Sequence, residues 1–118
     1  MCGLTGFLWN QKARYNIGSQ LKSMTDSIAH RGPDGEGFWF DEGVRVAIGH
    51  RRLSVLDLSS AGHQPMHSTS GQYIVAFNGE IYNHLDLREE LDNELNRLID
   101  WSGHSDTETL LLCFETWG

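Results

Sequence analysis

The chain has 118 residues, the length of one domain, and can bury only a modest hydrophobic core. Sixteen acidic residues against nine Lys and Arg give a formal net charge of −7, which argues against a nucleic-acid or anionic-membrane surface, because both require a basic patch. No apolar run approaches the length of a membrane span, and the N-terminus lacks the features of a secretory signal. We therefore expect no nucleic-acid or membrane partner and a cytoplasmic location.

The first half of the chain is predicted to contain strands around one helix. Residues 4–9 form a short apolar run typical of a strand. Residues 17–29 are predicted to form an amphipathic helix with apolar side chains at helical spacing, namely Ile17, Leu21, Met24 and Ile28. Glycines and a proline mark residues 31–37 as a loop, and residues 38–40 and 44–50 are predicted to pair as a hairpin.

The second half is predicted to be mostly helical. Residues 58–70 are rich in Ser, Gly and His, which is typical of a loop, and residues 73–77 are expected to form another strand. A second helical stripe follows, formed by Leu87, Leu91, Leu95 and Leu98. Ser105-Asp106-Thr107-Glu108 is a capping box that opens a third helix. The apolar face of that helix carries Leu110, Leu111, Phe114 and Trp117. Strands and helices in this order predict an α+β domain.

The most informative single residue is Cys2, which directly follows the initiator Met1. Methionine aminopeptidases remove Met1 when the next residue is small, and removal would leave a thiol and a free α-amine on one residue. That amine has a reference pKa of about 7.7–8, so it can take the thiol proton and later deliver it to a leaving group. One alternative is a small buried cysteine that opens a strand. A disulfide with Cys113 is another, and it would consume the thiol.

Asn78-Gly79 is a second candidate for a chemical role. An Asn side-chain amide and a neighbouring backbone N–H can both point at a developing oxyanion, and Gly lets the backbone approach closely. The alternative is an Asn-Gly turn, which is one of the commonest turn dipeptides, and the preceding strand fits both interpretations.

Five segments, in one order, resemble the glutaminase domain of class II glutamine amidotransferases, which are N-terminal-nucleophile hydrolases. Within that superfamily the chain is similar to the glutamine-hydrolysing asparagine synthetases, and the resemblance extends from Cys2 to Gly118. The segments are Met1-Cys2-Gly3 through Phe7, His30-Arg31-Gly32-Pro33-Asp34-Gly35, Gly49-His50-Arg51-Arg52-Leu53-Ser54-Val55-Leu56-Asp57, Ala76-Phe77-Asn78-Gly79-Glu80-Ile81-Tyr82-Asn83 and Gly103-His104-Ser105-Asp106-Thr107-Glu108.

This resemblance implies a four-layer α-β-β-α sandwich with Cys2 at the start of a central strand. It also implies that residues 1–118 are the N-terminal portion of a class II glutaminase domain. The rest of that domain and a synthetase domain would then be partners of this piece. ATP and Mg would belong to the synthetase domain, and the present sequence has no Gly-Lys-Ser/Thr phosphate loop. We expect residues 1–118 alone to be weakly active or inactive. The protein could also form a homo-oligomer.

The implied reaction is hydrolysis of L-glutamine to glutamate and ammonia, for ATP-dependent asparagine synthesis. Cys2 would be the nucleophile, Asn78 and Gly79 would hold the oxyanion, and no cofactor would be needed for this step. Two other interpretations stay open. One is amidation of a different carboxylate, such as a sugar acid, by the full-length enzyme. The other is a non-catalytic, degenerate glutaminase fold kept for interaction.

The resemblance also implies a pocket for the amino-acid end of glutamine. Arg52 would clamp the α-carboxylate, because a guanidinium pairs bidentately with a carboxylate, whereas Arg51 would be a variable neighbour. The pocket would be lined further by Leu53, Ser54, Val55 and Leu56. Glu80 and Asp106 would hold the α-ammonium. Without this context, Arg52 would be a solvated strand arginine and Asp106 a favourable acid in a first helical turn.

Six histidines raise the question of a metal site. His63 and His67 lie four residues apart, but in a loop and without a partnering Cys or carboxylate pattern, so no metal site is predicted. His30 and His50 lie within the motifs and are expected to hydrogen-bond loops rather than to catalyse.

Overall fold

The computed structural model describes residues 1–10, 15–55 and 58–118, and it has the mixed helix and strand content predicted for an α+β domain. Its elements in chain order are β1 (Gly3–Leu8), α1 (Ile17–Ser27), β2 (Gly35–Asp41), β3 (Val46–Arg52), β4 (Met66–His67), β5 (Ile74–Val75), α2 (His84–Glu94) and α3 (Asp106–Trp117). Short 3-10 helices occur at Ala29–Arg31 and Ser60–Gly62. The molecule is elongated, with principal extents of 49 × 30 × 18 Å.

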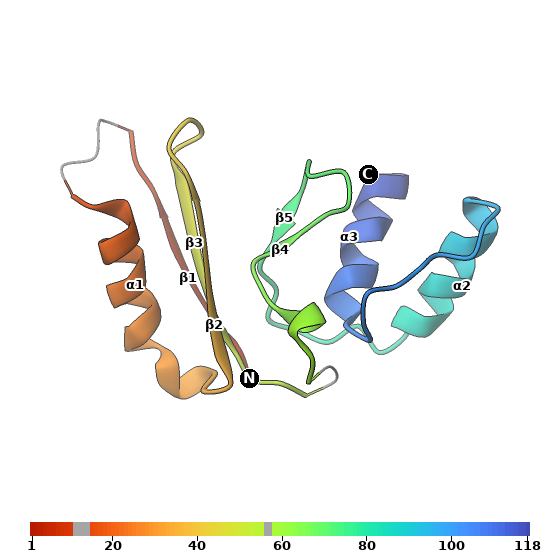
Figure 1. Cartoon of the computed structure of the whole chain (residues 1–118), viewed down its shortest axis with the longest axis horizontal. Helices are drawn as coiled ribbons and strands as arrows, with labels where there is room; N and C mark the ends of the chain where they lie inside the picture. Colours follow the sequence, from red (N-terminus) through yellow and green to blue (C-terminus); the bar gives the residue numbers. More distant parts are fainter. Residues whose placement is uncertain (11–14, 56–57) are drawn as a thin grey trace.

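Strands β1, β3 and β2 form an antiparallel sheet with β3 in the centre. Helix α1 covers one face of this sheet (Figure 1). Ile17 and Leu21 of α1 are buried with Ala47 of β3, and the partly buried rings of Phe7 and Trp9 pack against them. This small cluster follows the helical spacing and strand alternation that the sequence predicts.

Close contact between α1 and β3 depends on Gly49. A Cβ atom at Gly49 would lie 2.1 Å from Oγ1 of Thr25, well inside van der Waals contact. Thr25 is fully buried, and its hydroxyl donates to the carbonyl oxygen of Leu21 at 2.8 Å, so its polar atom is satisfied within the helix. The lack of a side chain at Gly49 therefore lets the helix lie directly on the strand.

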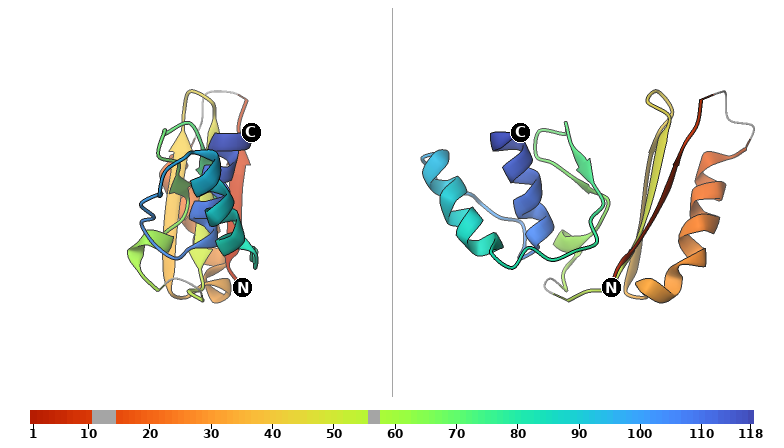
Figure 2. Two further views of the ribbon diagram at one scale, coloured as in Figure 1. Left: turned by 90° about the vertical axis from the view of Figure 1, so that its right-hand side faces the viewer. Right: turned by 180° about the vertical axis from the view of Figure 1, so that it is seen from behind.

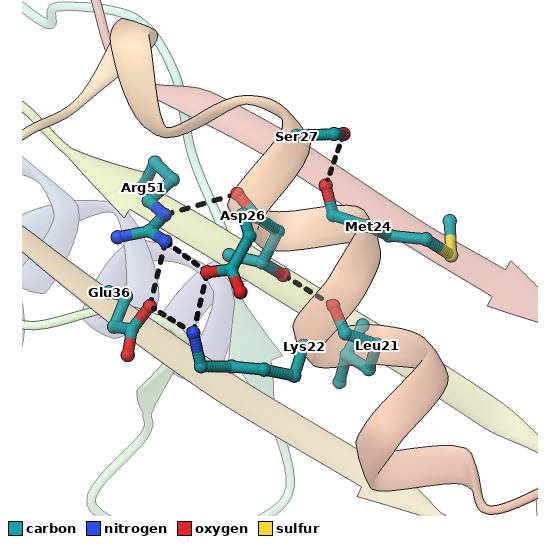
Figure 3. Close-up of polar contacts among 8 residues, drawn as sticks. Leu21, Lys22, Met24, Asp26, Ser27, Glu36 and Arg51 are labelled. Carbon is teal, nitrogen blue, oxygen red and sulfur yellow. Dashed lines mark hydrogen bonds and ion pairs between the residues drawn. The ribbon is translucent and has the colours of Figure 1, made fainter.

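Charged side chains fasten the end of α1 to the sheet at Arg51 (Figure 3). Nη2 of Arg51 lies 2.5 Å from Oδ1 of Asp26 and 2.9 Å from Oε2 of Glu36. Nζ of Lys22 contacts the same two oxygens, at 2.5 Å and 3.4 Å. The Arg51 side chain is only 13% exposed, so this cation is committed to the face of the sheet that α1 covers.

The short antiparallel pair β4–β5 lies on the other side of the sheet, followed by α3 and then α2 (Figures 1 and 2). Arg88 of α2 joins the two helices. Its guanidinium donates to Oγ1 of Thr109 at 2.9 Å and to the carbonyl oxygens of Gly103 and Ser105, both at 3.0 Å. It also lies 4.0 Å from the centre of the Trp101 ring, a cation–π contact. The start of α3 is thereby held by a side chain from α2.

Several predicted details differ from the structure. Strand β2 begins at Gly35, inside the predicted loop 31–37, because pairing with β3 supplies the hydrogen bonds that a glycine-rich segment lacks by itself. The predicted loop 58–70 contains β4, and the predicted strand 73–77 is reduced to β5. The predicted stripe on α2 is also wrong at Leu98, which lies beyond the end of the helix and is 90% exposed, whereas Leu91 is fully buried.

Helix α3 begins as predicted, although only half of the capping box forms. Oγ of Ser105 accepts from the N–H of Thr107 at 3.2 Å. The carboxylate of Glu108 accepts instead from the N–H groups of Ser102 and Gly103, at 2.8 Å and 3.1 Å. On the predicted apolar face, Leu111 is buried, while two aromatic side chains are about half exposed, Phe114 at 49% and Trp117 at 47%. Within the described ranges, no helix is both long and apolar enough to cross a membrane.

Candidate active site

A cavity of about 460 Å³ gathers residues from five separate stretches of the chain. Its lining consists of Met1, Cys2, Arg52, Leu53, Ser54, Val55, Gly62, Gln64, Phe77, Asn78, Gly79, Glu80, Ser105, Asp106 and Thr107. Every predicted site residue that the structure describes is in this set. The remaining prediction, Leu56, lies outside the described residues.

Cys2 lies immediately before β1, and its thiol is held by the backbone of Leu53. Sγ of Cys2 accepts from the N–H of Leu53 at 3.3 Å and donates to the carbonyl oxygen of the same residue at 3.6 Å. Arg31 donates through Nη2 to the carbonyl oxygen of Cys2 at 3.3 Å, which fixes the start of the strand. The thiol is half-buried and faces the cavity, which suits an accessible nucleophile. The nitrogen of Cys2 is bonded to Met1, which also lines the cavity and is 77% exposed.

Arg52 ends β3 and projects away from α1, because successive side chains of a strand point to opposite faces. Nη1 of Arg52 donates to the carbonyl oxygen of Ser59 at 2.7 Å. The backbone that follows is held by Asp34, whose Oδ2 accepts from the N–H of Ser54 at 2.8 Å. Asp34 also donates its own N–H to the carbonyl oxygen of Arg52 at 3.0 Å. Hydrogen bonds from Asp34 therefore hold the backbone of Arg52 and Ser54 in place beside the cavity.

Asn78 and Gly79 lie in the connection between β5 and α2, and they do not form a type I′ hairpin turn. Neither residue has the positive φ that such a turn requires. A Cβ atom at Gly79 would lie 2.6 Å from the ring of Phe77, so a side chain there would collide with its neighbour. Both residues line the cavity.

Asp106 and Glu80 differ in their surroundings although both line the cavity. Asp106 is only 6% exposed, and its Oδ2 accepts from the N–H of Ile81 at 2.8 Å. Glu80 is exposed. Asp106 is therefore more than a favourable charge in the first turn of α3, because it also fixes the segment that carries Asn78. Together, the two acids and Arg52 give the cavity both signs of charge, as the two charged ends of an amino acid require.

One of the predicted histidines lies deep in the molecule. His50 on β3 is fully buried beside the backbone of Phe77, which belongs to the connection between β5 and α2. Burial lowers the pKa of His50 below its ordinary value of 6.5; the backbone of Phe77 opposes this shift, whereas His63 and Arg52 add to it. Across residues 1–10, 15–55 and 58–118, no three His, Cys, Asp or Glu side chains converge as metal ligands do.

Six lining residues were not predicted from the sequence: Met1, Gly62, Gln64, Phe77, Ser105 and Thr107. Phe77, Ser105 and Thr107 adjoin predicted residues, so strand and cap signals could have included them. Gln64 carried no signal, because it lies in a polar loop where glutamine is unremarkable, yet it is only 7% exposed.

Comparison with known proteins identifies the family. Residues 1–118 match the model of the glutamine amidotransferase domain, and the chain belongs to that family. It is 39% identical to glutamine-hydrolyzing asparagine synthetase 1 of Bacillus subtilis, over 97% of this chain and 17% of that protein. It is 34% identical to amidase chry2 of Gibberella zeae, over 100% of this chain and 18% of that protein. The chain thus spans less than a fifth of the length of these two relatives.

Proposed function

We propose that this chain is the glutaminase half of an amidotransferase, which hydrolyses L-glutamine to glutamate and ammonia. The observation that carries this proposal is the convergence of Cys2, Arg52, Asn78, Gly79 and Asp106 on one cavity. A thiol, an amide donor, a cation and an anion are the groups that hydrolysis of an amino-acid side-chain amide requires.

The proposed reaction begins once Met1 is removed and the α-amine of Cys2 is free. That amine takes the thiol proton, and Sγ attacks the side-chain carbonyl carbon of glutamine. The resulting oxyanion accepts hydrogen bonds from the Asn78 amide and the Gly79 N–H. The carbon–nitrogen bond breaks as the protonated amine of Cys2 delivers its proton to the amide nitrogen, which leaves as ammonia. Water then attacks the thioester, which releases glutamate and regenerates the thiol.

Recognition of glutamine would use its charged ends. Arg52 would pair with the α-carboxylate, and Asp106 with Glu80 would bind the α-ammonium. The backbone of residues 53–55 borders the same cavity and would contact the chain of the substrate. Binding both charged ends of glutamine in this way would orient its side-chain amide towards Cys2.

The full-length protein would pass the ammonia to a synthetase domain that uses ATP and Mg, in the cytoplasm. The names of the Bacillus subtilis relatives support asparagine as the product. We also propose that this piece belongs to a four-layer α-β-β-α sandwich. The succession of α1, the β1–β3–β2 sheet, the β4–β5 pair and α3 along the long axis supports that architecture (Figure 1).

The test uses the full-length protein and measures glutamate release from glutamine. Cys2→Ala should abolish glutamine hydrolysis and leave synthesis from added ammonia, since ammonia bypasses the thiol. Cys113→Ala is the matched control and should retain both activities. Loss of both activities in Cys2→Ala, or of neither, would contradict the assignment.

A further inference from the structure

The segment that carries Asn78, Gly79 and Glu80 is held at both ends by side chains of the cavity. Before it, the N–H of Phe77 donates to Oε1 of Gln64 at 2.6 Å. After it, the N–H of Ile81 donates to Oδ2 of Asp106 at 2.8 Å.

The two anchoring side chains are themselves connected through Thr107. A backbone N–H can only donate, so the Gln64 atom that faces Phe77 must be the carbonyl oxygen. Nε2 of Gln64 then faces Oγ1 of Thr107 and donates to it at 3.1 Å. Since Oγ1 of Thr107 accepts that bond, its own hydrogen is available to Oδ1 of Asp106, 3.5 Å away. The N–H of Phe77 thus fixes the orientation of the Gln64 amide.

Water has little access to this polar chain of Gln64, Thr107 and Asp106. The exposed fractions of the three residues are 7%, 2% and 6%. Hydrogen bonds in such surroundings hold geometry well, and breaking one leaves a buried polar group without a partner. The chain therefore couples two parts of the cavity that come from distant segments, residues 77–81 and the start of α3.

We infer that Gln64 is a positioning residue, which acts through Phe77 and Thr107 to set the oxyanion donors and the ammonium-binding carboxylate together. This inference rests on the proposed glutaminase function. It assigns to Gln64 no contact with the substrate. Its consequence is that losing the Gln64 amide disturbs turnover and binding together. Losing the Thr107 hydroxyl removes one partner of Gln64 but leaves the bond from the N–H of Phe77 to Oε1 of Gln64, so its main effect is at the Asp106 end.

The experiment compares glutamine hydrolysis by variants of the full-length protein at a temperature well below unfolding. Gln64→Met removes both amide bonds at nearly constant volume, and should lower kcat and raise KM for glutamine, each by roughly tenfold. Thr107→Val should raise KM by about fivefold with kcat within about twofold, and Thr107→Ser should restore KM. Gln20→Met, on the exposed face of α1, is the matched control and should match the parent protein.

The outcomes separate this inference from the proposed function. If the parent protein hydrolyses glutamine and Gln64→Met has the kinetic constants of Gln20→Met, the positioning role is wrong and the glutaminase assignment stands. If the parent protein neither binds nor hydrolyses glutamine, the proposed function is wrong, and this inference is wrong with it. Should Gln64→Met fail to fold, the Thr107→Val and Thr107→Ser pair decides, since an equal KM in both variants also overturns the inference.

Discussion

Arg51 and Arg52 are neighbours in sequence and lie on opposite faces of the central strand β3. The Arg51 guanidinium is bound to Asp26 and Glu36 beneath α1, whereas Arg52 borders the cavity that contains Cys2 (Figure 3 shows the Arg51 side). The two arginines thus have different roles. Because successive side chains of a strand point to opposite faces of the sheet, Arg51 faces α1 and Arg52 faces the cavity.

This arrangement predicts distinct effects of two matched substitutions. Arg52→Lys should raise KM for glutamine by roughly tenfold or more, because an ammonium cannot form the planar fork with a carboxylate. Arg51→Lys should leave KM unchanged and lower the midpoint of thermal unfolding modestly, since its partners are on α1 and β2. Steady-state kinetics and thermal melts measure the two effects. Equal changes in KM at both positions would contradict the assignment of Arg52.

A second prediction concerns the amine of Cys2. Protein that keeps Met1, for instance behind an uncleaved N-terminal tag, should hydrolyse glutamine at least about a hundredfold more slowly, because the base is tied up in a peptide bond. Its thiol should still react with iodoacetamide. The control is the same protein after a cleavage that leaves Cys2 first, with intact mass confirming the terminus. Equal glutaminase rates before and after cleavage would rule out the amine as the base.

Packing of α1 on the sheet gives a third prediction. Gly49→Ala should lower the free energy of unfolding by about 1–3 kcal/mol, because the added methyl group meets Oγ1 of the buried Thr25. Gly18→Ala, in the first turn of α1, is the matched control and should be neutral or stabilising, since its Cβ would be 3.4 Å from the nearest atom. Denaturant unfolding measures both, and equal stability of the two variants would show that α1 can shift freely.

Burial of His50 gives a pH dependence of stability with a definite sign. The pKa of His50 is lowered in the folded protein, whereas the unfolded chain has the ordinary value of 6.5. The unfolded state therefore binds more protons as the pH falls below 6.5, and the free energy of unfolding decreases on acidification. Asp26 also has a lowered pKa, chiefly because Lys22 hydrogen-bonds to it, but it contributes only in more acid solution, as the pH falls below 3.8.

Denaturant unfolding at about pH 7.5 and about pH 5.5 brackets the His50 window and avoids the carboxylates. His50→Gln should reduce the loss of stability between these two conditions. His67→Gln, on the exposed part of β4, should show the same loss as the parent protein. A parent protein whose stability does not change between the two conditions would exclude a buried neutral His50.

The sequence best predicted the helices and strands whose formation depends on residues close together in the chain. Alternation of Val46 and Ile48 with Ala47 and Gly49 predicted a strand where β3 lies, and helical spacing predicted α1. Leu98 shows the limit of the same reasoning, because a leucine at the right spacing says nothing about where the helix ends.

Gln64 could not be predicted because its partners are distant in sequence. Thr107 is 43 residues away, and nothing in the loop around Gln64 indicates that its amide will be buried. The cavity residues that were predicted came from matches to family motifs, whereas the contact between Gln64 and Thr107 exists only once β4, β5 and α3 have packed. Long-range polar contacts of this kind leave no local pattern.

In chemical terms, Met1 is a protecting group. It blocks the one amine that the proposed reaction needs, and it lines the cavity where the substrate would bind. A single peptide cleavage would deprotect the base and vacate that space at once. A folded chain that keeps Met1 would then have the oxyanion donors, the charged side chains of the cavity and the Cys2 thiol in place. It would still lack the amine that accepts the thiol proton. Maturation, rather than folding, would be the event that switches the chemistry on.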